Sequence, residues 1–197
     1  MSGGGVDFGG LYVQFQPRIR SYLARLVGEH DAEDLTQTVF LKVSQALKDF
    51  RGESALATWI YRIATNTAAD WKRSAAFKRL TQQRTADVPS STEQAEKSPL
   101  GHENLPLLDQ VLIRREMSQC IRQVVDGLPE HYREVIALSE FEGMKNAEIA
   151  ETLGVSVDTV KIRLHRARGM LREAMKARCD LYRDERLGLA CDVKVCS

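Results

Sequence analysis

Apolar residues recur every three or four positions through the first 80 residues, a spacing that predicts three helices. The first apolar stripe ends near Gly28 and contains Leu11, Phe15, Ile19, Tyr22, Leu23 and Leu26. Asp31 is placed to cap the second helix, whose stripe contains Leu35, Val39, Phe40, Val43 and Leu47. After a polar turn, the third stripe contains Leu56, Ile60, Ile63, Ala64, Thr67 and Trp71. The pattern predicts a small helical domain over residues 1–80.

The next segment, Thr81–Pro106, lacks Ile, Phe, Tyr and Trp and contains runs rich in Ser and Pro. Such a segment buries too little apolar surface to offset the entropy of ordering it, so residues 81–106 are predicted to be a flexible linker. Helical spacing returns from about Leu107 to Val125, ends at Gly127-Leu128-Pro129, and starts again near Glu130. No alternating run of strand length is apparent. The predicted fold class is all-α, with a second helical domain over 107–176 and a tail over 177–197.

Residues 146–168 carry the pattern of a helix-turn-helix. Ala150 is small, as required where two helices cross closely, and Gly154 stands where the chain needs a left-handed residue after the first helix. Ser156 can accept a backbone N–H at the start of the second helix. The apolar positions of the pair are Ile149, Leu153, Val155, Val160 and Leu164. We therefore expect a helix-turn-helix in the second domain.

The second helix of this motif has an outward face that suits a DNA major groove. At about 100° per residue, Val160, Leu164 and Ala167 share the buried side, whereas Asp158, Ile162, His165 and Arg166 lie opposite, with Thr159 and Lys161 at the edges. An isoleucine among polar and basic residues fits contact with thymine methyls and base edges. Arg163 and Arg168 flank the face and are expected to hold phosphates. The alternative is a helical hairpin with a basic exterior.

The third predicted helix has a second polar face. The same rotation predicts burial of Leu56, Ile63, Ala64 and Trp71 and exposure of Arg62, Thr65, Asn66, Ala69, Lys72 and Arg73. An amide beside cations suits nucleic acid, because the amide reads a base edge while the cations hold the backbone. The charges are concentrated accordingly: the whole chain has a formal charge of +1, but residues 62–79 carry five basic residues against one acidic, and 155–178 carry seven against two.

Both halves contain segments that resemble one known family. Residues 31–40, 50–54 and 58–66 resemble the second conserved domain of bacterial extracytoplasmic-function (ECF) sigma factors, the small two-domain members of the sigma-70 family, and 128–135 with the helix-turn-helix resemble their fourth domain. The resemblance covers roughly 10–80 and 107–176 in the family's order. It implies a protein that directs RNA polymerase core to promoters and helps to melt them, often in stress responses, without catalysing a reaction itself.

The resemblance also implies roles for particular residues. The polymerase β′ clamp helices would dock on Asp31, Glu33, Asp34 and Gln37. The promoter's minus-ten element would be read by Phe50, Arg51, Gly52, Glu53 and Ser54, a loop that receives a flipped base, and by Arg62, Asn66, Asp70 and Arg73. The minus-thirty-five element would be read by Ser156, Asp158, Thr159, Lys161, Ile162, Arg163, His165 and Arg166, with nearby residues on the polymerase β flap. An anti-sigma factor is a further partner that the family suggests.

Three of the four cysteines, Cys179, Cys191 and Cys196, lie in the tail. Some family members carry cysteine-rich extensions that sense metal, and three thiolates can bind copper or zinc or form a disulfide. The spacing does not match a structural zinc pattern, so the alternative is a tail that packs on the second domain with free thiols.

Other function classes leave no matching signal. The sequence contains no phosphate-binding glycine loop, metalloprotease helix motif or nucleophile elbow, so we expect no enzyme. No secretory signal or run of about 20 apolar residues is visible, and we expect a cytoplasmic protein. The competing hypothesis is a stand-alone helix-turn-helix regulator whose first domain dimerises or binds a ligand.

Overall fold

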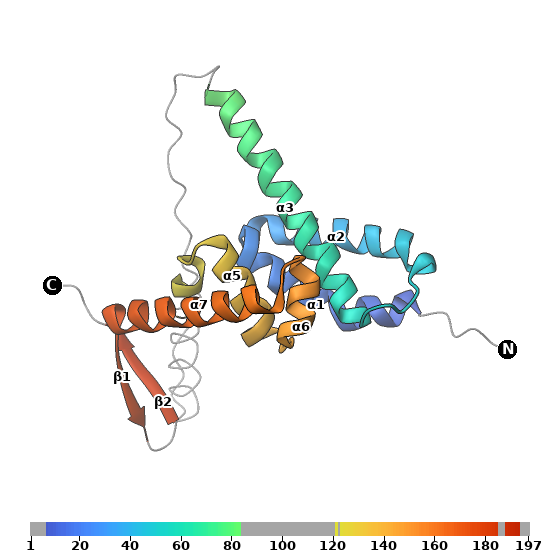
Figure 1. Cartoon of the computed structure of the whole chain (residues 1–197). Coiled ribbons are helices and arrows are strands. Elements are labelled where there is room, and N and C mark those ends of the chain that lie inside the picture. Colours follow the sequence, from blue (N-terminus) through green and yellow to red (C-terminus); the bar gives the residue numbers. More distant parts are fainter. Residues whose placement is uncertain (1–6, 84–120, 122, 185–187, 194–197) are drawn as a thin grey trace, which may run out of the picture.

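The computed structural model describes residues 7–83, 121, 123–184 and 188–193. Its first domain consists of α1 (Phe8–Val27), α2 (Glu29–Ala46), the 3-10 turn η1 (Leu47–Asp49) and α3 (Leu56–Gln83). These three helices pack on one another, and the carboxyl end of α3 projects away from the bundle (Figure 1). The three predicted helices are thus confirmed. α3 continues three residues past the predicted boundary at 80, and residues 84–106 of the predicted linker lie outside the described part.

The start of α2 differs from the expectation. The helix begins at Glu29, directly after Gly28, which has a φ of 95° and joins α1 to α2. Asp31 therefore lies inside the first turn and does not cap the helix; there its charge interacts favourably with the helix dipole. Leu47, predicted on the same helix, lies in η1. In this part of the chain a side-chain cap is present at α1, where Asp7 accepts hydrogen bonds from the backbone N–H groups of Gly9 and Gly10 at 3.1 and 2.8 Å.

The second domain contains α5 (Glu130–Ile136), the π-helical turn η2 (Ala137–Phe141), α6 (Asn146–Leu153) and α7 (Val157–Arg178). Most of the helix predicted over 107–125 lies outside the described residues. The predicted helix-turn-helix is confirmed as α6 and α7. Gly154 between them is left-handed, with a φ of 65°, and Ala150 is buried where the helices meet.

A two-stranded antiparallel hairpin follows α7, and the expectation that the chain contains no strand is wrong here. β1 (Cys179–Asp184) pairs with β2 (Gly188–Val193), and Figure 1 shows the hairpin at the far end of α7. A weak signal was present, because Leu189, Cys191 and Val193 alternate with Ala190 and Asp192 after Gly188. The two domains themselves are all-α, as predicted.

One apolar cluster runs through both domains. Ile19, Tyr22 and Leu23 of α1 and Ile60 and Tyr61 of α3 are completely buried, and the same cluster includes Val135, Ile149 and Leu164 of the second domain. α3 packs against α6 and α1 against α5, so the two domains are in contact. This contact decides which parts of α3 remain open to solvent.

Candidate nucleic-acid interface

The outward face of α7 has the composition that the sequence predicted. Val160, Leu164 and Ala167 are buried, whereas the exposed positions are Asp158, Lys161, Ile162, His165 and Arg166. Ile162 is 53% exposed, although it is one of the most apolar residues of the chain. Thr159 and Arg163 are half-buried at the edges. An apolar side chain surrounded by cations and hydrogen-bonding groups can contact base edges while its neighbours hold phosphates.

The first turn of α7 is held by its own side chains. The Ser156 hydroxyl accepts the backbone N–H of Thr159 at 3.1 Å, which confirms Ser156 as the helix cap. The Ser156 and Thr159 hydroxyls lie 2.8 Å apart, and Lys161 donates to the Asp158 carboxylate at 3.2 Å. These bonds fix the amino end of the helix. A phosphate could replace Asp158 as the partner of Lys161, because the pair is solvent-exposed and weak.

Hollows lie on both sides of this face. One, of about 270 Å³, is lined by residues of α5 and α7, namely His131, Tyr132, Thr159, Ile162, Arg163 and Arg166. The other, of about 360 Å³, is lined by Asn146, Lys161, Leu164, His165, Arg168, Gly169 and Arg172. His131, Asn146 and Arg172 were not among the predicted site residues. The signal for His131 and Asn146 was spatial, because α5 and α6 bring them beside α7, which a single helical wheel does not show. Arg172 lies on α7 itself, and its signal was its place on the same side of the helix as Lys161 and His165.

Two acidic residues, Glu140 and Glu134, border the face. Arg168, expected to hold phosphate, donates to the Glu140 carboxylate at 2.7 Å, so DNA would compete with that acid. Burial raises the pKa of Glu134 on α5, and the nearby Glu130 raises it further, whereas Lys72, Arg163 and Arg133 lower it. The cation Arg163 therefore faces a carboxyl group that its surroundings make harder to ionise.

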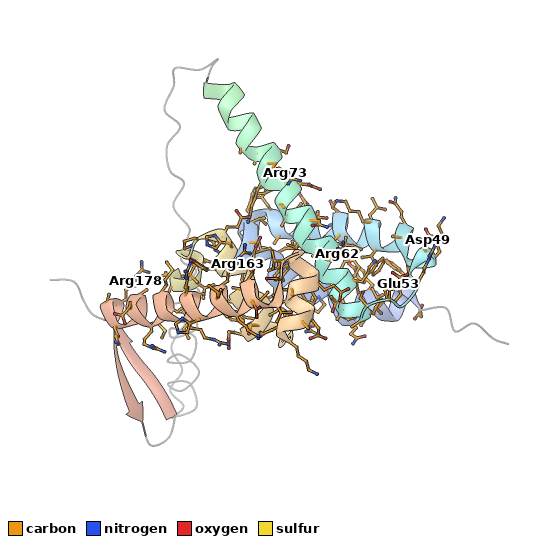
Figure 2. The ribbon with its side chains drawn as sticks, in the orientation of Figure 1. Asp49, Glu53, Arg62, Arg73, Arg163 and Arg178 are labelled. Carbon is orange, nitrogen blue, oxygen red and sulfur yellow. The ribbon has the colours of Figure 1, made fainter. Side chains whose placement is uncertain are left out.

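The exposed face of α3 agrees with the prediction only in part, because Ala69 and Lys72 are half-buried and Thr65 is buried. Arg62, Asn66, Asp70 and Arg73 are exposed, and Arg73 donates to the Asp70 carboxylate. Figure 2 shows Arg62 and Arg73 at separate points along this helix. Thr65 is only 7% exposed, so its predicted exposure is wrong. Its hydroxyl bonds the Tyr22 hydroxyl at 2.8 Å and the Tyr61 carbonyl at 2.8 Å, because α1 packs on this side of α3.

The loop before α3 forms one wall of a cavity of about 310 Å³. The cavity is lined by Asp49, Phe50, Arg51, Glu53, Ser54, Trp59, Arg62 and Glu151. Figure 2 shows Asp49 and Glu53 at this loop and Arg62 beyond them on α3. Gly52 has a φ of 72°, a conformation that the sharp turn requires and that side chains rarely adopt. All five predicted loop residues belong to this segment, and four of them line the cavity.

The aromatic residues of this region have different environments. Trp59 is half-buried against Phe50, with ring centroids 5.0 Å apart, and still lines the cavity. Tyr61 is completely buried, so it cannot stack on a base. Its hydroxyl donates to Glu142 of the second domain, and burial together with that bond raises the Tyr61 pKa.

The outward side of α2 is a third surface. Glu33, Asp34 and Gln37 are exposed, whereas Asp31 is half-buried, and Glu33 is engaged by Arg20 of α1 at 2.9 Å. Leu41, one turn after Gln37, is 60% exposed and was not predicted as a site residue. Its signal was its place on the acidic face, opposite the stripe of Val39 and Val43. The surface is thus acidic with an apolar centre.

The tail places two cysteines in the hairpin. Cys179 pairs with Val193 and Cys191 with Leu181, so the two cysteines occupy opposite strands two register positions apart. Cys196 lies outside the described residues. Within the described ranges, no three His, Cys, Asp or Glu residues gather as a metal site. Nor does any described helix have the length and apolar character that a membrane crossing requires.

Two family models match the chain. Residues 11–78 match "Sigma-70 region 2", and residues 118–171 match "Sigma-70, region 4". The chain is 31% identical over 186 residues to RNA polymerase sigma factor SigZ of Bacillus subtilis, covering 94% of this chain and 96% of that protein. It is 32% identical over 158 residues to the ECF RNA polymerase sigma-E factor of Escherichia coli K12, covering 80% and 81%.

Two solved structures share the fold. The sigma factor RpoE of Bartonella quintana, in complex with the anti-sigma factor NepR, matches with a TM-score of 0.66 and 23% identity over 86% of this chain and 97% of that one. CnrH, in complex with the cytosolic domain of CnrY, matches with a TM-score of 0.59 and 24% identity over 86% and 88%. SigZ matches nearly the whole chain, and the two family models match both domains in order. These findings favour the sigma-factor hypothesis over the hypothesis of a stand-alone helix-turn-helix regulator.

Proposed function

The chain belongs to the sigma-70 family, among its extracytoplasmic-function members, and from this premise we propose how its surfaces divide the work of promoter recognition. It is a sigma factor, which binds RNA polymerase and promoter DNA and directs initiation without being an enzyme. The proposal concerns which residues perform each step. The protein would act in the cytoplasm, where RNA polymerase works.

The α7 face would read the minus-thirty-five element in the major groove. The observation that carries this assignment is Ile162, 53% exposed at the centre of a basic face with a hollow on each side. Ile162 and His165 would contact base edges, while Arg163, Arg166 and Lys161 would hold phosphates. Asp158, Thr159 and Ser156 would set the register of the helix start.

The α3 face and the preceding loop would capture the minus-ten element as a single strand. Asn66 can form paired hydrogen bonds with a base edge, and Arg62 and Arg73 can hold the backbone on either side of it. A base extruded from the stack, at a cost of a few kcal/mol, would enter the cavity beside Trp59. The cavity wall formed by Arg51, Glu53 and Ser54 would offer hydrogen bonds to that base.

The α2 surface would bind the polymerase β′ clamp helices. Asp34 and Gln37 are free of intramolecular side-chain pairs in the described residues, and Leu41 supplies an apolar centre to this acidic surface. A central apolar residue with a polar rim is a common arrangement of interfaces. The exposed surroundings of the helix-turn-helix would meet the β flap.

Regulation by an anti-sigma factor is a further part of the proposal. Both structures of similar fold are of complexes, one with the anti-sigma factor NepR and the other with the cytosolic domain of CnrY. A partner of this kind would hold the protein inactive by covering its polymerase-binding or DNA-binding surfaces.

Metal or redox sensing by the tail is the second regulatory candidate. The hairpin register places Cys179 and Cys191 on neighbouring strands, two register positions apart, which supports this candidate. With Cys196 they would supply soft ligands for copper or zinc. Mass spectrometry of the native protein, compared with a Cys179→Ser/Cys191→Ser variant, tests this: bound metal or an oxidation-dependent disulfide lost in the variant supports it, and neither in the native protein overturns it.

Transcription from genomic DNA fragments with purified core polymerase tests the promoter assignment. Adding the protein should create new start sites that share two upstream sequence elements. Lys161→Ala should weaken their use, whereas Arg178→Ala, at the far end of α7 (Figure 2), should leave it unchanged. The absence of any start site that depends on the protein would reject the proposal.

A further inference from the structure

A buried carboxylate joins the two domains. Glu142 follows η2 in the second domain, and its side chain is only 5% exposed. Arg18 of α1 donates to this carboxylate at 3.2 Å and also to the Glu142 carbonyl at 3.2 Å. Tyr61 of α3 donates its hydroxyl to the same carboxylate. Two helices of the first domain therefore hold one side chain of the second, and a buried carboxylate needs such partners.

Further contacts border this junction. Lys72 of α3 donates to Glu130 of α5 at 2.7 Å, and Arg133 of α5 donates to the Arg25 carbonyl at 3.5 Å. The Arg25 guanidinium lies 4.0 Å from the centre of the Phe141 ring. Of these contacts only Lys72–Glu130 joins two charged groups, and it lies near the surface, where an ion pair contributes little. Among the polar contacts, the buried Glu142 carboxylate is therefore the one on which the junction depends most.

The junction also brings an acid to the base-receiving cavity. Because α6 packs against α3, Glu151 of α6 lines the same cavity as Phe50, Arg51 and Trp59 of the first domain. Two arginines of the lining face three carboxylates, those of Asp49, Glu53 and Glu151. Without Glu151 the cavity lining would contain two positive and two negative side chains. A single strand of DNA entering along Arg62 would meet both the body of α6 and an additional negative charge.

We propose that the second domain inhibits the first in the free protein: Glu142 fastens a closed arrangement in which Glu151 occupies the mouth of the base-receiving cavity. The proposal rests on the assignment of that cavity to the minus-ten element. Opening would move α6 away from α3 and release Glu151 from the cavity. A partner that binds the open arrangement better, as polymerase would by holding the two domains apart, shifts the population toward DNA capture.

Quenching of Trp59 fluorescence tests the closed arrangement directly. The chain has two tryptophans, so a full-length Trp71→Phe protein reports on Trp59 alone. In this background Glu151→Gln should raise quenching by iodide, an anion, with little change in quenching by neutral acrylamide. Glu142→Ala should raise both, because α6 moves away. Glu140→Gln is the matched control, since Glu140 pairs with Arg168 inside its own domain, and it should change neither.

Binding of short, labelled single-stranded DNA of random sequence to the free protein tests the consequence. Glu142→Ala and Glu151→Gln should each tighten binding by about fivefold or more, a typical coupling between two sites. Glu173→Gln removes a carboxylate at a distance from the cavity and should have a smaller effect. Arg18→Ala removes the partner of Glu142 on the first domain and should tighten DNA binding as much as Glu142→Ala does. The double variant Arg18→Ala/Glu142→Ala should bind no more tightly than either single variant.

The outcomes separate the inference from the proposed function. If Glu142→Ala melts early, Arg18→Ala and the milder Glu142→Gln still report on the junction. Unchanged quenching and DNA binding in Arg18→Ala and Glu151→Gln would overturn the inhibition, even where the wild type supports transcription with core polymerase. If Glu151→Gln opens the cavity to iodide while a bound promoter strand leaves Trp59 unaffected, the assignment of the cavity is wrong instead.

Discussion

The two DNA-facing helices differ in how many sides they pack. α7 buries one stripe, Val160, Leu164 and Ala167, and leaves its outward face open. α3 packs against α1 and α2 on one side and against α6 on another. When one side of a helix is covered, a rotation of about 100° per residue predicts which positions are buried. When two sides are covered, this rotation alone does not predict which positions are buried. The difference also separates their roles, because only the α3 site can be changed by a movement of the other domain.

The largest effect is expected where α7 meets the core. Leu164→Ala removes a side chain that is 3% exposed and should lower the free energy of unfolding by about 2–5 kcal/mol. Ile162→Ala, two residues away on the open face, should change stability by less than about 0.5 kcal/mol but weaken upstream promoter recognition. Urea denaturation measures the stability of each variant, and promoter binding by the holoenzyme measures its upstream recognition. Equal loss of stability in both variants would contradict the one-sided packing of α7.

On α3, Asn66→Ala should weaken promoter opening by about 1–3 kcal/mol, the value of a good base contact. Asn66 is exposed and belongs to α3, whereas the proposed polymerase-binding residues belong to α2, so binding to core should be nearly unchanged. Opening is followed with a fluorescent base in the melted region, and core binding by co-purification. If the variant loses both to the same extent, the residue supports the fold or the polymerase contact, and does not read a base.

Thr65→Val tests the covered side of the same helix. The change keeps the shape but leaves the Tyr22 hydroxyl without the Thr65 partner 2.8 Å away, which should cost about 1 kcal/mol or somewhat more. Denaturation should register this cost, while promoter opening measured below the melting range should not change. A specific loss of promoter opening at full stability would instead make Thr65 part of the DNA face.

The neighbouring residues Thr65 and Asn66 of α3 also show how much of the structure the sequence alone could predict. The helices, the helix-turn-helix and the outward residues of α7 between Asp158 and Arg166 followed from the apolar spacing, because α7 is covered on one side only. Thr65 was misassigned because its burial depends on α1, and Glu151 was absent from the predicted site because it reaches the cavity from another domain. Tyr61 likewise gave no sign of its bond to Glu142, which lies 81 positions away. Contacts of this kind arise from packing between distant segments, which periodicity does not encode.

Lys161→Ala should have a smaller effect that depends on salt. Lys161 is exposed and pairs with the Asp158 carboxylate, which is itself exposed. Exchanging this carboxylate for a DNA phosphate is expected to release about one counterion. The slope of upstream DNA affinity against salt should therefore fall by about one, with stability unchanged. An identical slope in variant and wild type would remove Lys161 from the phosphate contacts. Arg178→Ala provides the baseline for a basic residue at the far end of α7.

The smallest effect concerns Glu134, a half-buried residue of α5 that interacts electrostatically with Lys72 of α3 and Arg163 of α7. Burial raises its pKa above the ordinary 4.5, so the folded protein holds this proton more tightly than the unfolded chain does. Its contribution to stability is then fully present below pH 4.5 and decreases as the pH rises through the folded-state pKa. Glu134→Gln removes this loss, so urea denaturation at neutral pH should show a slightly more stable variant, with the difference vanishing in acid. A variant that is less stable at neutral pH would mean that the ionised carboxylate is held by Lys72 and Arg163, and would make it an ionic link between the two helices.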